Sequence, residues 1–381
     1  MQLVAHCLTD GLPLVIASRD VRTFPLRVAL IEGEALDSWL EFVAYRHRTP
    51  PGVLLRYCGI DPQVFLHSWL VRPQLGQFER LAALTEEPLE DLAAATLLRY
   101  AGVEFDRAAR GQRPRPSAWG WRVFSRLCPQ CLSDSGGRWQ IAWRLNWTFA
   151  CLRHRRILAE SCARCCGRQR WGTLRAREVP TPGRCARAYR DRTRLAIVAC
   201  SADLTRAGGL RLADTDPALG AQRLINDLLD GEPVDLPLYR GSDATARLIL
   251  HDIKTIARWA ISAVASEEFE CLASAQLVAE LARQNRHQCQ DATRPSSSAA
   301  INPCAAEAAI GIIVATHIVG ALDGSASTEM LARLMRSARA VGRHVSIPAH
   351  ATLTPRVQHI HARAHDVVVG DNTGPVTIGS S

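Results

Sequence analysis

Two pairs of metal-ligand residues in the middle of the chain could hold one cation. Cys128 and Cys131 are separated by two residues, and Cys151 and His154 repeat that spacing after nineteen intervening residues. Two such pairs can converge on a tetrahedral zinc ion. Four protein ligands, three of them thiolates, leave no coordination position for substrate, so the expected site is structural. The alternative is four buried residues without metal, because free cysteine often packs as a small hydrophobic side chain.

A second group of cysteines follows directly. Cys162 and Cys165 form another close pair, but fourteen residues, ARAYRDRTRLAIVA, separate Cys185 from Cys200. Closure entropy grows only logarithmically with loop length, so a site can tolerate this insertion. We therefore expect a second, distorted structural zinc site from these four cysteines and a total of one or two zinc ions per chain. Cys166 is an alternative to Cys165, and a metal-free loop is the alternative to the site.

Cysteine usage and hydropathy indicate the cellular setting. Eight of the thirteen cysteines lie between residues 128 and 200, which favours metal binding over a disulfide framework. The opening MQLVAHCLTDGLPLVIAS is a poor secretory signal, because no basic run precedes its apolar stretch. The longest uncharged apolar run, 308–322, is too short to span a bilayer. We expect a cytoplasmic protein without a membrane partner.

The basic charge of the chain is concentrated around the candidate zinc ligands. The net charge is +9, yet residues 101–200 hold 21 arginines against six acidic residues. Such a concentration is typical of a protein that binds a polyanion such as DNA, and the planar guanidinium group suits phosphate. Arg153, Arg155 and Arg156 adjoin His154 and are the expected DNA contacts. A solvated basic face or an interface with an acidic protein is the alternative.

Helices are expected on both sides of the cysteine-rich segment. GEALDSWLEFVAYRHR has apolar residues at helical spacing, and VLLRYCGI follows the turn formers of residues 50–52, so the two resemble a helix-turn-helix. TEEPLEDLAAATLLRYAG predicts a helix that begins at the possible N-cap Thr85. Near the end, GSDATARLILHDIKTIARWAISAVA and STEMLARLMRSARAVG have helical periodicity.

These patterns predict a mainly α fold with a central zinc-finger or zinc-ribbon region. Six of the nine tryptophans lie between residues 119 and 171, where they are expected to pack over the metal loops, with base stacking as the alternative. The expected parts are an N-terminal tail (1–22), a helical part (23–115), zinc modules (116–205), a helical domain (206–290), a linker (291–304) and a helical C-terminal region with a frayed tail (305–381).

The motifs of catalysis are missing from the sequence. There is no phosphate-binding glycine loop, no His-Glu-x-x-His helix and no Gly-x-Ser-x-Gly elbow. A carboxylate metal cluster for phosphoryl transfer is not expected in a basic region with six acidic residues. We therefore expect a protein that is not an enzyme. A metal-dependent nucleic-acid enzyme with dispersed acidic residues remains the alternative.

Several motifs, taken in order, resemble the TniQ family of transposition proteins, which includes the TnsD-type target-site selectors. They are FPLRVALIEGEALDSWLEFVAYR, RLCPQCL, WRLNW, CLRHRRIL and CARCCG, which span about residues 23–205. Within them, Glu34, Ser38, Trp39 and Leu40 and the first four zinc ligands match the family pattern. The wide spacing from Cys185 onward departs from it.

The resemblance implies a largely helical protein with helix-turn-helix elements and zinc modules. It implies a non-catalytic role in target-site selection, in which the protein connects target DNA or a target-recognition complex to the transposition machinery. DNA and a transposase or transposition ATPase are the partners that follow, and a homodimer stays open. A zinc-stabilised adaptor between proteins, without direct DNA contact, is the second hypothesis.

Overall fold

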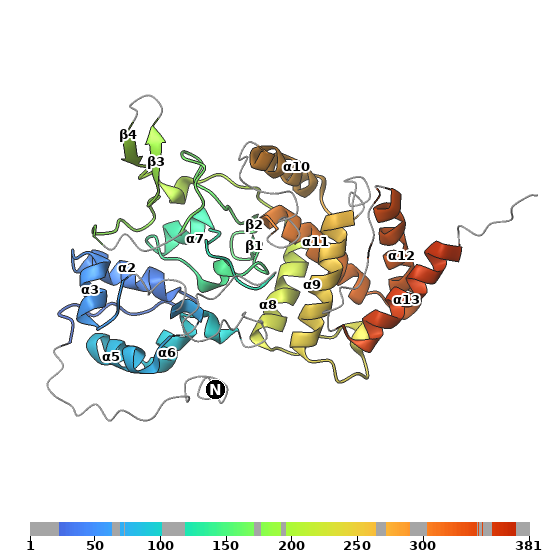
Figure 1. Cartoon of the computed structure of the whole chain (residues 1–381), viewed down its shortest axis with the longest axis horizontal. Coiled ribbons are helices and arrows are strands. Elements are labelled where there is room, and N and C mark those ends of the chain that lie inside the picture. The colour runs from blue at the N-terminus through green and yellow to red at the C-terminus, as the bar shows by residue number, and fades with distance from the viewer. Residues whose placement is uncertain are drawn as a thin grey trace, which may run out of the picture. The chain divides into compact units, whose positions relative to one another are not determined.

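A computed structural model of the chain describes residues 23–62, 69–71, 73–100, 119–170, 177–191, 196–263, 272–289, 303–340, 342, 345 and 353–370. It divides into two compact units, Met1–Gly209 and Leu210–Ser381, here called the N-terminal and C-terminal units. Helices dominate both units (Figure 1), which confirms the mainly α class. The expected N-terminal tail, most of the expected linker and the end of the chain lie outside the described residues. The finer domain boundaries stay predictions.

The first two described helices of the N-terminal unit follow the sequence pattern. Helix α2 spans Leu36–Arg46 and buries its apolar side, and α3 spans Pro51–Tyr57. Proline is well placed at the first position of α3, because its missing N–H would have no partner there. A short turn joins the helices, and Gly59 follows α3 with a φ of 74° that favours glycine. The pair is thus two short helices joined by a turn, and its assignment as a helix-turn-helix stays a prediction.

The prediction that Thr85 begins a helix is wrong. Thr85 is instead the last residue of α5 (Leu75–Thr85), where its hydroxyl donates to the Leu81 carbonyl at 2.7 Å. The chain then passes through Glu86 in the left-handed region, and α6 (Leu89–Ala94) begins after Pro88. Threonine can bond back to the preceding helical turn as well as cap the next helix, so its type alone does not decide between the two.

The cysteine-rich part of the N-terminal unit consists of short elements. Two antiparallel hairpins carry its strands, with Cys151 paired to Arg156 in the first and Ala188 to Ala199 in the second. The elements are α7 (Pro129–Asp134), β1 (Ala150–Cys151), β2 (Arg156–Ile157), β3 (Ala188–Asp191), β4 (Ala196–Ala199) and the single-turn 3-10 helices η2 (Ile141–Arg144) and η3 (Leu204–Arg206). The 3-10 helix η1 (Leu97–Arg99) precedes this part, after α6.

A single hydrophobic cluster underlies both cysteine groups. Leu127, Leu132, Leu158 and Leu204 pack there with cysteines of both groups and with two tryptophans, Trp139 and Trp143. The five tryptophans between residues 119 and 147 are all at most 5 % exposed. Their rings therefore serve as core for a region with little regular structure, as expected, and are not available for stacking on bases.

The C-terminal unit is a helical assembly built around α11 (Ala305–Val319). This helix is apolar and almost completely buried, and it contacts α8, α9, α10 and α12 (Figure 1). At Gly311, a β-carbon would lie 3.0 Å from the Ala257 carbonyl oxygen, so glycine permits the close approach of α11 to α9. The remaining elements are α8 (Pro217–Asp230), the 3-10 helix η4 (Pro237–Tyr239), α9 (Ala246–Ala263), α10 (Ala275–Cys289), α12 (Gly324–Ala340) and α13 (Pro355–Gly370).

The two segments predicted to be helical in this unit form α9 and α12. Ile249, Ile253 and Ile256 of α9 are buried, as are Leu331 and Met335 of α12. No helix among the described residues is both long enough and apolar enough to cross a membrane.

Candidate metal centres

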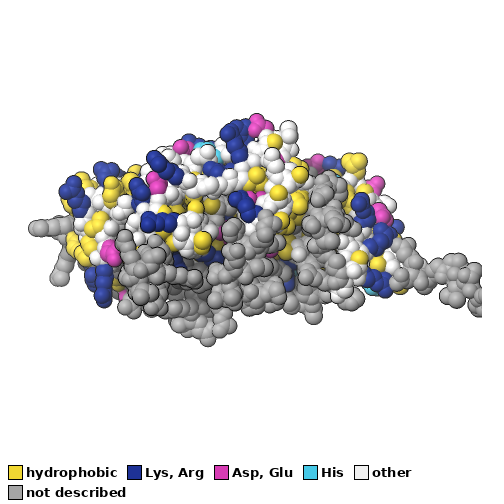
Figure 2. Space-filling model, turned by 90° about the horizontal axis from the view of Figure 1, so that it is seen from above, with side chains coloured by type: hydrophobic (Ala, Val, Ile, Leu, Met, Phe, Trp, Pro, Cys, Tyr) yellow, Lys and Arg dark blue, Asp and Glu magenta, His cyan; other side chains and the backbone are white. Residues whose placement is uncertain are grey.

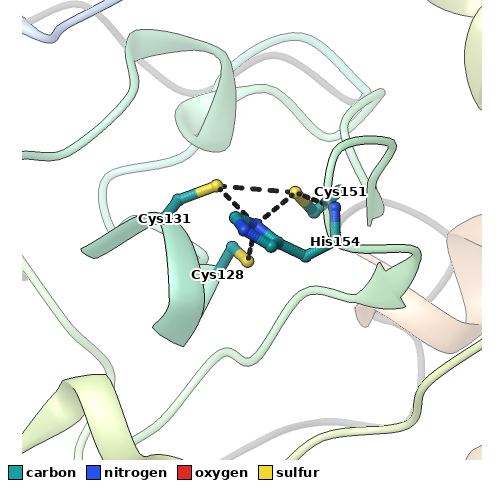
Figure 3. Close-up of side chains that lie close together, drawn as sticks. All are labelled: Cys128, Cys131, Cys151 and His154. Carbon is teal, nitrogen blue, oxygen red and sulfur yellow. Dashed lines mark hydrogen bonds between the residues drawn. The ribbon is translucent and has the colours of Figure 1, made fainter. Parts of the chain in front are cut away.

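The first four predicted zinc ligands converge in the structure. Cys128 caps the N-terminus of α7 and Cys131 lies within it, while Cys151 ends β1 and His154 lies in the turn before β2. Figure 3 shows the four side chains pointing toward one another. The His154 Nδ1 atom lies 3.2 Å from the Cys131 Sγ, 3.5 Å from the Cys128 Sγ and 3.6 Å from the Cys151 Sγ. The elements thus bring two distant sequence pairs to one point.

The spacing of these atoms fits a tetrahedral zinc ion. Bonds of about 2.3 Å to sulfur and about 2.0–2.1 Å to nitrogen give tetrahedron edges of about 3.8 Å between sulfurs and about 3.6 Å between sulfur and nitrogen. The Sγ atoms of Cys131 and Cys151 lie 3.5 Å apart, and all four ligand atoms lie within 4.8 Å of one another. The donor set and its dimensions therefore suit zinc.

The crowding of thiols also favours a cation at this point. The pKa of the Cys131 thiol is raised, most of all by its hydrogen bond to the Cys128 sulfur. Its hydrogen bond to the Cys151 sulfur and its burial raise this pKa further. Neighbouring sulfurs repel one another when they are all ionised, so three thiolates at this spacing need a positive charge among them. A bound metal ion supplies that charge and displaces the protons.

The second group of cysteines is also assembled. Cys162 lies 3.7 Å from Cys200 and Cys165 lies 3.7 Å from Cys185, measured between Sγ atoms, close to the sulfur edge expected for zinc. All four ligand atoms lie within 4.8 Å of one another. Cys166 is exposed and lies outside this group. Of the two alternatives, the structure brings Cys165 to the cluster.

The insertion between Cys185 and Cys200 forms a hairpin. Strands β3 and β4 pair from Ala188 with Ala199 to Asp191 with Ala196, which brings the two ends of the insertion together. The Ser201 amide also donates to the Cys185 carbonyl at 3.1 Å. An antiparallel ladder keeps its two ends adjacent whatever its length, and for this reason the fourteen-residue separation does not disperse the ligands. Among the described cysteines, those of both groups are free thiols and form no disulfide.

Buried carboxylates of α2 hold the cysteine-rich region against the N-terminal helices. Asp37 is fully buried and accepts hydrogen bonds from Arg144 at 2.5 Å and from Arg170 at 2.7 and 2.9 Å. Arg170 also donates to Glu41 at 2.6 Å. Burial alone would raise the pKa of Asp37, but the two guanidinium groups outweigh it and lower that pKa to about 2.

The Glu34 and Ser38 pair forms a second contact of the same kind. Glu34 forms an ion pair with Arg138, and the Ser38 hydroxyl donates to Glu34 at 3.0 Å while it accepts from the Trp139 amide at 2.8 Å. Glu34, just before α2, and Ser38, within it, both belong to the family resemblance and dock this helix on the loop between the two halves of the first ligand set. Sequence spacing gave no signal for this contact, because its partners lie about a hundred residues apart.

Part of the local arginine excess is internal to the fold. Arg122 and Arg126 are fully buried and both donate to Glu160, at 2.7 and 2.9 Å. Arg144 and Arg170 are paired with Asp37 of α2, and Arg138 with Glu34 just before this helix, as described above. On the face seen in Figure 2, Lys and Arg side chains lie in separate groups among hydrophobic and acidic ones. The composition of residues 101–200 therefore overstates the basic surface.

The three arginines predicted to contact DNA lie in the turn and strand that follow Cys151. The Arg153 side chain is 71 % exposed and donates to Asp134 at 3.0 Å. Arg156 donates to the Gln130 side chain at 2.6 Å and to the Gly209 carbonyl at 3.1 Å. Arg155 is half-buried and has a φ of 46°. The hairpin thus holds all three on a short, ordered element.

Together these features define a mainly helical protein in which N-terminal helices dock on a cysteine-rich region with two groups of four side chains that could each hold a metal ion. The TniQ family model matches residues 25–158, from the segment before α2 through the first ligand set. This part, about a third of the chain, belongs to the TniQ family. The second ligand set and the C-terminal unit lie beyond the match. No curated protein matches the sequence.

Proposed function

We propose that this chain is a non-catalytic, zinc-containing DNA-binding protein that selects target sites in transposition. The observation that carries the proposal is the TniQ match over residues 25–158, which ends just after the first ligand set and the adjoining arginines. In this role the protein connects target DNA, or a complex that recognises the target, to a transposase or transposition ATPase. The cytoplasm is its proposed location, and a homodimer is one arrangement open to it.

Zinc is the metal that both ligand sets fit best. Thiolate-rich sets of four with edges near those of a zinc tetrahedron are typical of structural zinc sites, whereas catalytic zinc keeps an open position for water. Cys128, Cys131, Cys151 and His154 would hold one ion, and Cys162, Cys165, Cys185 and Cys200 the second. With all positions filled by protein, neither ion would contact a substrate. This supports a structural role and not an enzymatic one.

DNA binding is proposed for the arginines of the first hairpin and for the helix pair α2 and α3. Metal ligation on either side of Arg153 would fix the backbone that presents it, and a pre-ordered charge loses less entropy on binding. Arg56, in α3, is exposed and adds positive charge on this helix pair. Both elements lie within the residues that match the family model.

A gel-shift series at several salt concentrations tests DNA binding. Phosphate contacts release counterions, so affinity should fall steeply with salt, and each lost contact should reduce the slope of log K against log salt by about 1. Replacing Arg153, Arg155 and Arg156 by alanine is expected to flatten the dependence while zinc content stays unchanged. The matched control replaces three exposed arginines outside the hairpin, Arg27→Ala, Arg240→Ala and Arg283→Ala, and should leave the slope closer to that of the parent.

The adaptor hypothesis has one specific observation in its favour. Arg153 and Arg156 already have partners within the chain, Asp134, Gln130 and Gly209, so a phosphate must compete for them. An adaptor predicts no salt-sensitive DNA binding but an undiminished requirement for the protein in transposition. A gel-shift series run beside a reconstituted transposition reaction separates the two hypotheses, because insertion that requires the protein without salt-sensitive DNA binding leaves only the adaptor. Unchanged insertion after the protein is omitted would contradict both.

A further inference from the structure

One acidic residue lies next to the first ligand set without belonging to it. Asp134 is the last residue of α7, three positions after Cys131 and six after Cys128. Residues three apart in a helix share a face, so the helix that delivers two sulfurs also delivers this carboxylate to the same side. The sequence Cys-x-x-Cys-x-x-Asp contains this periodicity, although metal-ligand spacing alone does not point to the aspartate.

The His154 ring lies between the ligand sulfurs and Asp134. Its Nδ1 atom faces the three sulfurs at 3.2–3.6 Å, and its Nε2 atom lies 3.1 Å from the Asp134 Oδ2. An ionised carboxylate only accepts, so the hydrogen bond requires a proton on Nε2. A neutral imidazole then has its lone pair on Nδ1, directed at the sulfurs.

We propose that Asp134 is a positioning residue of the first metal centre, which holds His154 in the tautomer and orientation that bind the metal through Nδ1. Metal-bound histidines generally donate their second ring N–H to a carboxylate or carbonyl, and this contact orients the ring and raises its basicity. The inference rests on the proposed metal binding by this cluster.

Arg153 completes the arrangement from the solvent side. Its guanidinium group lies 3.0 Å from the same Asp134 Oδ2 that faces His154. A carboxylate oxygen has two lone pairs and can accept both bonds. Asp134 is 38 % exposed on its side chain, so Arg153 restricts a carboxylate that would otherwise move freely in water. Arg153, Asp134 and His154 therefore form one hydrogen-bonded chain that ends at the ligand set.

The second ligand set has no histidine and is supported differently. Its Cys185 sulfur accepts a hydrogen bond at 3.5 Å from the side-chain amide of Gln169, a buried neutral donor. A donor stabilises a thiolate, whereas an acceptor such as Asp134 supports an imidazole N–H. The role of Asp134 is therefore specific to the site that contains His154.

The test measures the affinity of the full chain for zinc by competition with a chelator. Asp134→Asn is expected to raise the Kd of the first site roughly 10- to 100-fold, the range for loss of such a partner. Asp235→Asn is the matched control, because Asp235 pairs with Arg240 as Asp134 pairs with Arg153 but lies in the C-terminal unit. It should leave the Kd unchanged. Arg153→Ala should weaken binding less than Asp134→Asn, because the bond to His154 remains.

A second background separates positioning from a general effect on α7. In a His154→Cys chain the imidazole is replaced by a fourth thiolate, so Asp134→Asn should no longer change the Kd. Cobalt absorption distinguishes a site of three thiolates and one imidazole from a site of four thiolates, and it reports which site responds. An equal loss in both backgrounds, or an Asp134→Asn chain that matches the Asp235→Asn control, would overturn the inference.

The nitrogen chemical shifts of His154 provide a measurement that needs no variant. In the zinc-loaded parent, the inference requires metal on Nδ1 and a proton on Nε2, and metal on Nε2 would refute it. A parent chain that binds no zinc would reject the metal proposal together with this inference. A parent that binds zinc with unchanged affinity after Asp134→Asn would reject this inference alone.

Discussion

At the scale of single residues, Asp37 shows how a buried charge is balanced in the N-terminal unit. The carboxylate is fully buried between Arg144 and Arg170, and the neighbouring Glu41 shares Arg170. Burying an ion pair gives little net stability compared with an apolar contact, but removing one member leaves the other charges buried and uncompensated. Removing Asp37 alone should therefore destabilise the fold more than the intact ion pairs stabilise it.

Asp37→Asn is accordingly expected to lower the free energy of unfolding of the N-terminal unit by about 3–5 kcal/mol. Tryptophan fluorescence during urea unfolding at saturating zinc reports this unit, because eight of the nine tryptophans precede residue 172. Asp235→Asn, which alters an exposed pair, is the control and should leave the transition unchanged. A midpoint for Asp37→Asn equal to that of the control would show that the buried arginines do not depend on this carboxylate.

The metal ligands and the buried arginines differ in how far they could be predicted from sequence. Cys128 and Cys131, like Cys151 and His154, are recognisable because each pair is local and the residue types are chemically specific. Arg144 and Asp37 are 107 residues apart, and nothing in either neighbourhood marks an arginine that will be buried. Amino-acid composition counts buried and exposed arginines alike. For this reason it suggested a larger basic surface than the structure has.

At the scale of elements, the β3–β4 hairpin shows how local pairing assembles a site from distant ligands. The sequence indicated an insertion but did not predict a hairpin, because its ends are defined by pairing and not by a turn motif. Replacing residues 191–196 with Asn-Gly would close the ladder directly after the Arg190 and Ile197 pair, with a turn suited to two-residue hairpins. Zinc content should remain at two per chain, because Cys185 and Cys200 stay side by side.

Deleting residues 188–191 is the matched control for that change. It also shortens the chain by four residues, but it removes β3 and with it the pairing that returns the chain to Cys200. Zinc content should then fall to one per chain by metal analysis. Equal zinc content in the two variants would mean that the hairpin does not position the second ligand set.

In the C-terminal unit, Asp252 joins three elements. It lies in α9 and accepts hydrogen bonds from the Tyr239 hydroxyl of η4 at 3.0 Å and from the amide and hydroxyl of Thr354, just before α13, at 3.0 and 2.5 Å. Burial raises the pKa of Asp252 above its usual range despite these bonds. The folded chain therefore holds the proton more tightly than the unfolded chain.

This difference fixes the sign of a pH effect. A carboxyl with a raised folded-state pKa destabilises the fold above that pKa and loses this effect as pH falls toward its ordinary value of about 3.9. The stability of the parent relative to Asp252→Asn, which cannot titrate, should rise as pH is lowered from about 7 to about 4.5. Hydrogen exchange of peptides from α9 and α13 measures this difference in stability between the two chains at each pH. A constant difference, or one that falls, would contradict the raised pKa.

At the scale of the whole molecule, the two units obtain their stability from different sources. The cysteine-rich part of the N-terminal unit has short strands, few helical turns and a core that includes cysteines of both candidate metal centres. The C-terminal unit surrounds a buried helix with other helices, and its described residues contain no group of three or more metal-ligand side chains. Metal removal should therefore act on one unit and spare the other.

A chelator is expected to abolish hydrogen-exchange protection in residues 119–209 while α8 through α13 keep theirs. Structural zinc contributes about 10–16 kcal/mol in small zinc modules, which equals or exceeds the whole stability of a typical domain, about 5–15 kcal/mol. The loss of even one ion should thus unfold the cysteine-rich region. The ion pairs of Asp37 and Glu34 with that region would then be lost, which should expose α2 to exchange as well. The C-terminal unit, observed in the same sample, is the internal control. Full protection of residues 119–209 after zinc is gone would show that the ligand sets pack as ordinary core, and equal loss in both units would show that they unfold together.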